Sequence, residues 1–195
     1  GWSTENEIFS INELIESFKL ENVQKAAAVF DLKRFNWVSS QQLSKLGENE
    51  FFEAIKPFME DEDINENSAN YKKILLAMRT AKTNLKDIAH ATRPFFFELD
   101  GYDEKGVKKF LNESLETLTF ATEVLSKLSE WNETELDMAL IKIRDYFNIP
   151  IPKVNQPMRI ALVGSTVSPS LGLTLELFGK DKSLDRIQKA IDFIS

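Results

Sequence analysis

Apolar residues recur every three or four positions along residues 104–129, and this spacing constrains the fold more than any other feature of the chain. The series consists of Val107, Phe110, Leu111, Leu115, Leu118, Ala121, Leu125 and Leu128. An α-helix turns once in about 3.6 residues, so this spacing places all of these side chains along one side of a helix. Such a side must be buried against other helices, and the fifteen Phe residues supply ample core material. We therefore predict a helix over residues 104–129 inside a helical bundle.

Helix-start signals occur at several other places. Ser10 with Glu13, and Asn132 with Glu135, have the spacing of capping boxes, and the second pair is expected to open a helix that runs through Tyr146. Further helices are expected around residues 41–46, 51–55 and 69–81. Gly47 is predicted to end the first of these as a left-handed C-terminal cap.

Prolines and glycines suggest the remaining boundaries. Thr83 is a candidate cap for a helix that should end before Pro94. Residues 149–157 contain three prolines and are predicted to be extended. Residues 159–163 are too short for periodicity to separate a buried strand from a helical turn. Two short helices are expected to close the chain, one ending at Gly179 and the other starting after Ser183.

Together these signals predict an all-α protein, an irregular helical bundle or cage of about ten helices in two or three subdomains. No apolar run approaches the roughly 20 residues that a membrane-spanning helix needs. We therefore expect a protein that does not enter a membrane.

Charge is distributed unevenly along the chain, whose net charge is −7. Residues 48–66 contain eight acidic side chains against Lys56 alone, whereas residues 71–93 contain six basic side chains against Asp87 alone. Exposed charges are screened beyond about 10 Å at moderate salt, so a local basic face can bind an anion on an acidic protein. The simpler alternative is that these segments are solvated helix faces.

Several kinds of site lack the residues that they need. The chain has no Cys and a single His, His90, which leaves a zinc site without ligands and excludes disulfides. Asp61 begins a stretch that resembles a calcium loop, but Glu66 stands where the turn needs Gly and Lys72 where a bidentate Glu is needed. Neither a phosphate-binding loop nor a nucleophile elbow is present. We predict no catalytic residue and no metal site in this chain.

Three stretches resemble the C-terminal portion of bacterial-type glutamate–tRNA ligases. The first consists of Gly1–Ser3, Phe9–Phe18 and residues 28–38, where Phe30, Asp31 and Trp37 match the family pattern. The second is residues 78–97. The third is the most specific. It consists of PMRIALVG at 157–164, SPSL at 168–171, LFGK at 177–180 and RIQKA at 186–190.

This resemblance implies three regions, a stem-contact-like region at 1–46 and two anticodon-binding subdomains at 47–100 and 101–195. It implies a cytoplasmic class I aminoacyl-tRNA synthetase that attaches glutamate to tRNA using ATP. The catalytic domain is expected to precede Gly1, and ATP and magnesium are implied for that domain only. The expected partner is tRNA(Glu), and nothing in the sequence requires more than a monomer.

The resemblance also implies particular tRNA-binding residues. Arg159 is expected to meet the anticodon, together with a turn formed by Ser168, Pro169 and Leu171. The alternatives are a structural salt bridge for Arg159 and a core position for Leu171. Arg144 is a weaker candidate.

Many family members have an arginine at the position of Ala81, where it reads the third anticodon base. Here Arg79 and Lys82 flank that alanine, and both are candidate tRNA-binding residues. Loss of the arginine suggests a relaxed enzyme that also accepts tRNA(Gln). For the chain as a whole, the alternatives are a stand-alone helical tRNA-binding protein and a protein-interaction scaffold.

Overall fold

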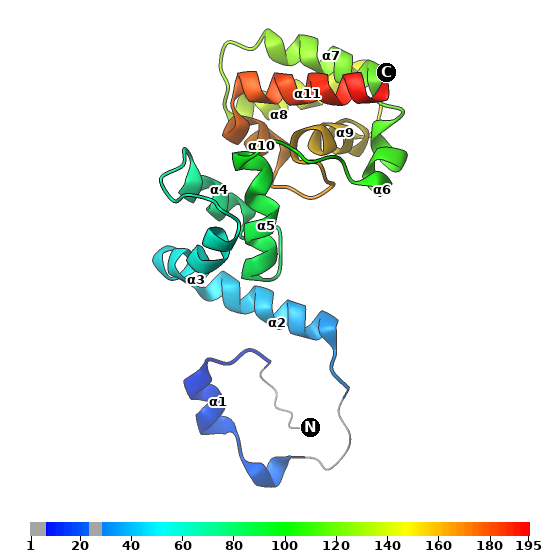
Figure 1. Cartoon of the computed structure of the whole chain (residues 1–195). Coiled ribbons are helices and arrows are strands. Elements are labelled where there is room, and N and C mark those ends of the chain that lie inside the picture. Colours follow the sequence, from blue (N-terminus) through cyan, green and yellow to red (C-terminus); the bar gives the residue numbers. More distant parts are fainter. Residues whose placement is uncertain (1–6, 24–28) are drawn as a thin grey trace.

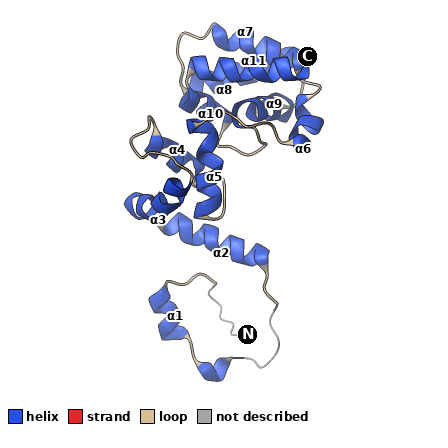
Figure 2. Cartoon of the chain, viewed as in Figure 1, coloured by secondary structure: helices blue, strands red, loops and turns tan. Residues whose placement is uncertain are grey.

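The computed structural model describes residues 7–23 and 29–195, and these fold into helices joined by turns and loops (Figures 1 and 2). None of the described residues lies in a strand, so the prediction of an all-α protein is confirmed. Gly1–Ser3 and residue 28 of the first family-like stretch lie outside the described residues. No helix among the described residues is both long enough and apolar enough to cross a bilayer.

The structure gives the following bounds. In chain order the elements are α1 (Ile11–Ser17), the 3-10 turn η1 (Leu20–Asn22), α2 (Leu32–Lys45), α3 (Glu48–Asp61), α4 (Tyr71–Met78), α5 (Leu85–Phe96), α6 (Glu104–Gly106), the π-helical turn η2 (Val107–Leu111), α7 (Leu115–Ser126), α8 (Glu133–Phe147), α9 (Ile151–Val163), α10 (Leu171–Phe178) and α11 (Lys180–Ile194).

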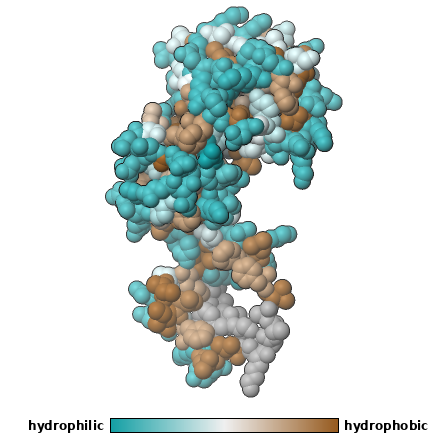
Figure 3. Space-filling model, in the orientation of Figure 1, coloured by the Kyte–Doolittle hydropathy of each residue, from teal (hydrophilic) through white to brown (hydrophobic). Residues whose placement is uncertain are grey.

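These elements follow one another along an elongated molecule (Figure 1). Helices α6 to α11 form a bundle at one end, α3 to α5 form the middle, and α2 leads from the middle to α1. Figure 3 shows hydrophobic surface gathered on the described residues at the α1 and α2 end. The rest of the face seen there is mostly hydrophilic.

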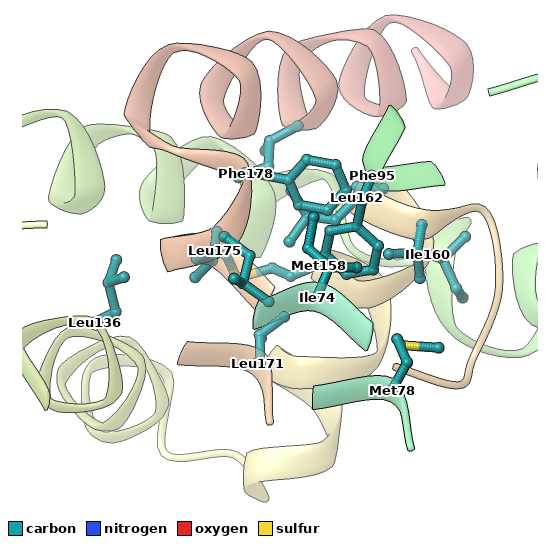
Figure 4. Packing of buried hydrophobic residues seen from close by; sticks show 14 of the residues in the cluster. Ile74, Met78, Phe95, Leu136, Met158, Ile160, Leu162, Leu171, Leu175 and Phe178 are labelled. Carbon is teal, nitrogen blue, oxygen red and sulfur yellow. The ribbon is translucent and has the colours of Figure 1, made fainter. Parts of the chain in front are cut away.

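One hydrophobic core runs through the middle and the C-terminal bundle. Phe95, near the end of α5, stacks on Phe178 of α10 with 4.7 Å between ring centroids. Figure 4 shows Ile74 and Met78 of α4 in the same cluster as Met158 and Leu162 of α9. The core therefore joins α4 and α5 to the bundle directly.

Three prolines that we expected to lie outside helices lie inside them. Helix α5 continues through Pro94 to Phe96, and α9 contains both Pro152 and Pro157. Pro152 is in the first turn, where a backbone donor has no partner within the helix, while Pro157 removes one hydrogen bond. Pro157 is itself buried, as are most residues that follow it in α9. The packing of these buried α9 residues outweighs the hydrogen bond that Pro157 removes. The prediction of an extended 149–157 segment was therefore wrong. Residues 159–163, which periodicity could not assign, are helical.

The predicted helix over residues 104–129 is interrupted. Asn112 donates its N–H to the carbonyl of Val107 at 3.1 Å, which is the five-residue spacing of a π-turn. The Ser114 hydroxyl then donates to the Leu111 carbonyl at 2.6 Å, and α7 starts afresh at Leu115. Most of the apolar series stays on the buried side despite the break, because Leu111, Leu118 and Leu125 are fully buried, whereas Leu115, next to the break, is 41% exposed.

Local capping was predicted well at two helices. Ser10 accepts from the Glu13 N–H at 3.2 Å and donates its own N–H to the Glu13 carboxylate at 2.7 Å, so this capping box is confirmed. Asn132 accepts from the Glu135 N–H at 3.1 Å and begins α8 as predicted.

Three boundary predictions were wrong. Gly47 has φ of −65° and begins α3 instead of ending α2 in the left-handed region. Asn84, not Thr83, caps α5 by accepting from the Asp87 N–H at 2.8 Å. Gly179 has φ of +78°, and this turn lets α11 begin at once, so Ser183 is a buried residue inside the helix.

Candidate nucleic-acid interface

Arg159 lies in the second half of α9, and its side chain reaches the loop between α9 and α10. Its Nε donates to the Ser168 hydroxyl at 2.8 Å, and its Nη2 donates to the Pro169 carbonyl at 3.3 Å. The Ser168 hydroxyl also lies 3.1 Å from the Thr174 hydroxyl of α10. The structure therefore brings together Arg159, Ser168 and Pro169.

The charge of Arg159 has no carboxylate partner among the described residues, so the alternative of a structural salt bridge is not what the structure shows. The side chain is half-buried, and this burial lowers the pKa of the guanidinium. A half-buried cation without a counter-ion favours an anionic or strongly accepting ligand. Its Nη1 makes no hydrogen bond within the described part of the chain, which leaves N–H donors for such a ligand.

Ser170 and Gly172 fix the far end of the same loop. Ser170 caps α10 by accepting from the Leu173 N–H at 3.3 Å, and it donates to the Glu133 carboxylate at 2.5 Å. A Cβ on Gly172 would lie 2.4 Å from Asp137 Oδ1 and 2.9 Å from the Glu133 carbonyl. Only glycine allows α10 to approach α8 this closely, so the loop has a fixed end.

Leu171 is only 2% exposed. Figure 4 shows it among the core side chains, close to Leu175 of the same helix. Its side chain supports the loop from the core side and offers no surface to a ligand, which corresponds to the core alternative raised from the sequence.

Arg79 is engaged in holding two helices together. Its guanidinium donates to the carbonyl of Leu43 in the last turn of α2 and, at 2.5 Å, to the carbonyl of Leu46 just after the helix. It also lies over the Phe51 ring, 5.1 Å from the centroid. Cations at a helix C-terminus satisfy carbonyls that lack a helical partner. The structure thus places Arg79 at the α2–α4 junction and away from Arg159.

Lys82 lies close to the loop between α9 and α10. It lines a pocket of about 250 Å³ with Asp87 and His90 of α5, and with Val163 and Val167 next to the loop. Ser165 of the loop also lines this pocket, so the pocket borders the loop that Arg159 contacts. Of the two basic residues beside Ala81, only Lys82 lies next to this loop.

Arg144 lies at the C-terminal end of α8 and pairs with its neighbour. Its Nε is 2.8 Å and its Nη2 2.6 Å from Asp145 Oδ1. No contact within the described residues connects it with Arg159.

Sequence reasoning missed the role of Arg186. This side chain is 2% exposed, donates to the Phe97 carbonyl at 2.6 Å and to the Leu162 carbonyl, and lies 4.6 Å from the Phe178 ring centroid. It therefore joins the ends of α5, α9 and α10, and burial lowers the pKa of its guanidinium. The available signal was its helical spacing, because Ser183, Ile187 and Ala190 lie on the same buried side of α11.

His90 is exposed and interacts with Glu62. Its Nδ1 lies 3.1 Å from one carboxylate oxygen of Glu62, and Arg93 donates to the other at 3.0 Å. Within the described ranges, no three or more His, Asp or Glu side chains are grouped so that they could hold a metal ion.

Comparisons with known proteins point to one family. Residues 50–191 match the model of a family described as "Anticodon binding domain". The chain is 32% identical over 199 residues to a "Glutamate--tRNA ligase" of Thermodesulfovibrio yellowstonii, covering 98% of this chain and 43% of that protein. It is 31% identical over 201 residues to "Glutamate--tRNA ligase 1" of Caldanaerobacter subterraneus subsp. tengcongensis, covering 100% of this chain and 42% of that protein.

Two solved structures are also similar. A glutamate tRNA ligase from Elizabethkingia meningosepticum, solved in complex with its amino acid, aligns with a TM-score of 0.78 and 27% identity, over 100% of this chain and 39% of that one. A glutamate-tRNA synthetase from Elizabethkingia anophelis aligns with a TM-score of 0.74 and 27% identity, over 98% of this chain and 38% of that one. The chain thus spans well under half the length of each of these relatives.

Proposed function

Because this chain belongs to the anticodon-binding domain family, we propose that it recognises the anticodon loop of tRNA as part of a glutamate–tRNA ligase. The observation that supports this most is Arg159, a half-buried cation that is fixed by Ser168 and Pro169 and has no carboxylate partner among the described residues. The parent enzyme would join glutamate to tRNA(Glu) with ATP. We infer that it acts as a monomer in the cytoplasm.

Recognition would use the chemistry of an unpaired RNA loop. Bases in such a loop are unstacked, and proteins read their exposed edges by hydrogen bonds while cations meet the phosphates between them. Arg159 is planar and always charged, and two of its nitrogens are already bound to the loop. The remaining N–H groups then have a fixed direction toward a base acceptor or a phosphate.

The pocket between Lys82 and the loop offers a second contact for the same RNA. Lys82 is a flexible point charge, and an arginine at position 81 would be a planar fork. A good bidentate contact to a base discriminates by about 1–3 kcal/mol. We propose that Ala81 relaxes the reading of one anticodon base and lets the parent enzyme charge tRNA(Gln) as well.

Catalysis is assigned to the rest of the parent enzyme. ATP and magnesium would belong to that part of the enzyme, as the resemblance to glutamate–tRNA ligases implies. The contribution of this chain would be to bind tRNA.

Binding of an anticodon stem-loop RNA tests the proposal. The dissociation constant would be measured for the tRNA(Glu) loop and for loops with one anticodon base changed. Arg159→Ala should weaken binding of the cognate loop about tenfold or more and reduce the preference for it, since one bidentate contact discriminates by about 1–3 kcal/mol. Lys127→Ala is the control, because Lys127 is an exposed cation at the end of α7 and is not one of the candidate tRNA-binding residues.

Two outcomes would contradict the proposed function. If the protein binds all loops alike and Arg159→Ala changes nothing, this chain does not read an anticodon through Arg159. Binding of proteins instead of RNA, with little dependence on salt, would favour the interaction scaffold, since RNA binding weakens steeply as salt rises.

A further inference from the structure

A second basic pocket lies on another side of α9. It has a volume of about 400 Å³ and is bordered by η2, α7 and α9, with Lys109 and Lys153 among its lining residues. Pro157 also lines it, and Arg159 is two residues further along the helix. Two residues correspond to a rotation of about 200°, so this pocket and the Arg159 loop lie on roughly opposite sides of α9.

The charge inside this pocket is positive. Neither Lys109 nor Lys153 forms an ion pair within the described part of the chain, and Glu113 is the one carboxylate among the lining residues. The ammonium group of Lys109 lies 5.0 Å from the centroid of the Phe110 ring. Two ammonium groups against one carboxylate leave a net positive site that is suited to an anion.

The backbone around the pocket also favours binding of an anion. The π-turn η2 bears Lys109, and such turns widen a helix and are frequent at functional sites. Ser114, at the start of α7, donates its hydroxyl to the Leu111 carbonyl, so no side chain caps this 12-residue helix. Uncapped N–H groups at a helix start contribute partial positive charge.

The pocket is coupled to the Arg159 loop through backbone contacts. The Asp103 N–H donates to the Gly164 carbonyl at 2.7 Å, directly after α9. A Cβ on Gly106 would lie 3.0 Å from the Ile160 side chain and 3.3 Å from Thr166. Helix α6 and the adjoining π-turn are therefore docked closely on α9 and on the start of the loop. The pocket and the loop are thus held at a fixed separation.

We propose that this pocket binds a backbone phosphate of the same RNA whose loop meets Arg159, and this inference rests on the proposed function. Lysine ammonium groups bind phosphates as point charges without reading sequence. The pocket would thus supply affinity and orientation, while Arg159 supplies discrimination between loops.

The test is the salt dependence of stem-loop RNA binding by the whole chain. Replacing both lysines in a Lys109→Ala/Lys153→Ala variant should weaken binding several-fold for every loop sequence alike. It should also lower the slope of log K against log salt by about one, as expected when one phosphate contact is lost. Glu113→Gln should have the opposite effect and tighten binding.

Lys127→Ala is the matched control, because Lys127 is an exposed lysine at the other end of α7 and lines a different groove. It should leave the salt slope unchanged. Titration with inorganic phosphate, followed through the amide signals of residues 107–117, separates a free phosphate site from an RNA contact. Signals that move in the native chain and stay fixed in the double variant support the pocket.

The double variant and Arg159→Ala test the phosphate pocket and anticodon reading independently of each other. If the double variant binds every loop with native affinity and salt slope while Arg159→Ala still loses discrimination, the pocket has no role in RNA binding and the proposed function stands. Phosphate-dependent signals without any change in RNA binding would likewise overturn the assignment to RNA. If the native chain binds no RNA at all, both fail together.

Discussion

Residues 7–46 and residues 101–195 use the same helix signals with opposite results for burial. Eleven of the seventeen exposed large hydrophobic side chains lie in the described part of 7–46, among them Ile15 at 68% and Phe30 at 73% exposure. Leu43 is the one buried residue of α2, and α1 has none. The C-terminal bundle buries Leu118, Leu136 and their neighbours almost completely.

The difference shows that helix formation and core formation are separate problems for this chain. The capping box of α1 forms within four residues and needs no partner helix. Burial requires neighbouring helices, and most helical stability in proteins comes from that packing. The bundle should therefore determine the cooperative stability of the molecule, with α1 contributing little.

The largest difference in the free energy of unfolding is expected between truncation of a buried leucine in the bundle and truncation of an exposed isoleucine in α1. Leu118→Ala removes a fully buried side chain from α7 and should lower the free energy of unfolding by about 2–5 kcal/mol. Ile15→Ala in α1 should change it by roughly 0.5 kcal/mol or less, because that side chain is exposed. Urea unfolding followed by circular dichroism measures both. Similar losses would mean that α1 packs against the rest of the protein in solution.

Arg186→Ala should follow in size. It leaves the carbonyls of Phe97 and Leu162 without their donor inside the core. An unsatisfied buried group destabilises by about 1–3 kcal/mol, so a loss of that order or somewhat more is expected in the same urea experiment. Arg186→Lys should recover part of it, since one ammonium can reach only some of these acceptors. A variant as stable as the native chain would show that water replaces both bonds.

Arg79→Ala should have a smaller and local effect. It removes the donor to the Leu43 and Leu46 carbonyls at the junction of α2 with the middle region, a contribution of about 1 kcal/mol. Hydrogen exchange should become faster in α2 while the amides of α7 keep their protection. Faster exchange throughout the bundle would remove the proposed independence of the two regions.

The smallest expected effect is the pH dependence of Glu62, in the middle region. Burial opposes ionisation, but hydrogen bonds from Arg93 and His90 outweigh it and hold the pKa of Glu62 below its usual 4.5. The ionised form is thus favoured by folding. This contribution is present above about pH 4.5 and is lost as pH falls through the lower folded-state pKa.

A Glu62→Gln variant tests this by comparison. The difference in unfolding free energy between native chain and variant should be constant near neutral pH and shrink in acid. A difference that does not change with pH would assign the effect to packing alone.

The sequence could predict what depends on neighbours along the chain. The all-α class follows from the spacing around Leu118, and the starts of α1 and α8 follow from Ser10 and Asn132, because each cap is a local hydrogen bond. The course of the chain through Pro94 and Pro157 could not be obtained this way. There the packing of distant helices outweighs a local preference.

In the candidate site, too, the residues near one another in sequence could be predicted, whereas those defined by distant contacts could not. The resemblance indicated Arg159, Ser168 and Pro169, and the structure adds the hydrogen bonds that join them. Arg186 and the Lys109 pocket were missed. A buried arginine without a carboxylate partner is defined by carbonyls far away in the sequence, and a π-turn has no spacing signal of its own.

Gly172 has a consequence for anyone who would redesign the recognition loop. A methyl group at this position would collide with Asp137 and the Glu133 backbone. The glycine therefore keeps the first turn of α10 packed against α8, whatever the sequence of the preceding loop. Residues 165–167 can then be varied in sequence at constant length, while Ser168 is kept because its hydroxyl holds Arg159. Variants with altered RNA preferences should be sought among these positions. Gly172 should be kept, so that every new loop ends at the same place on α8.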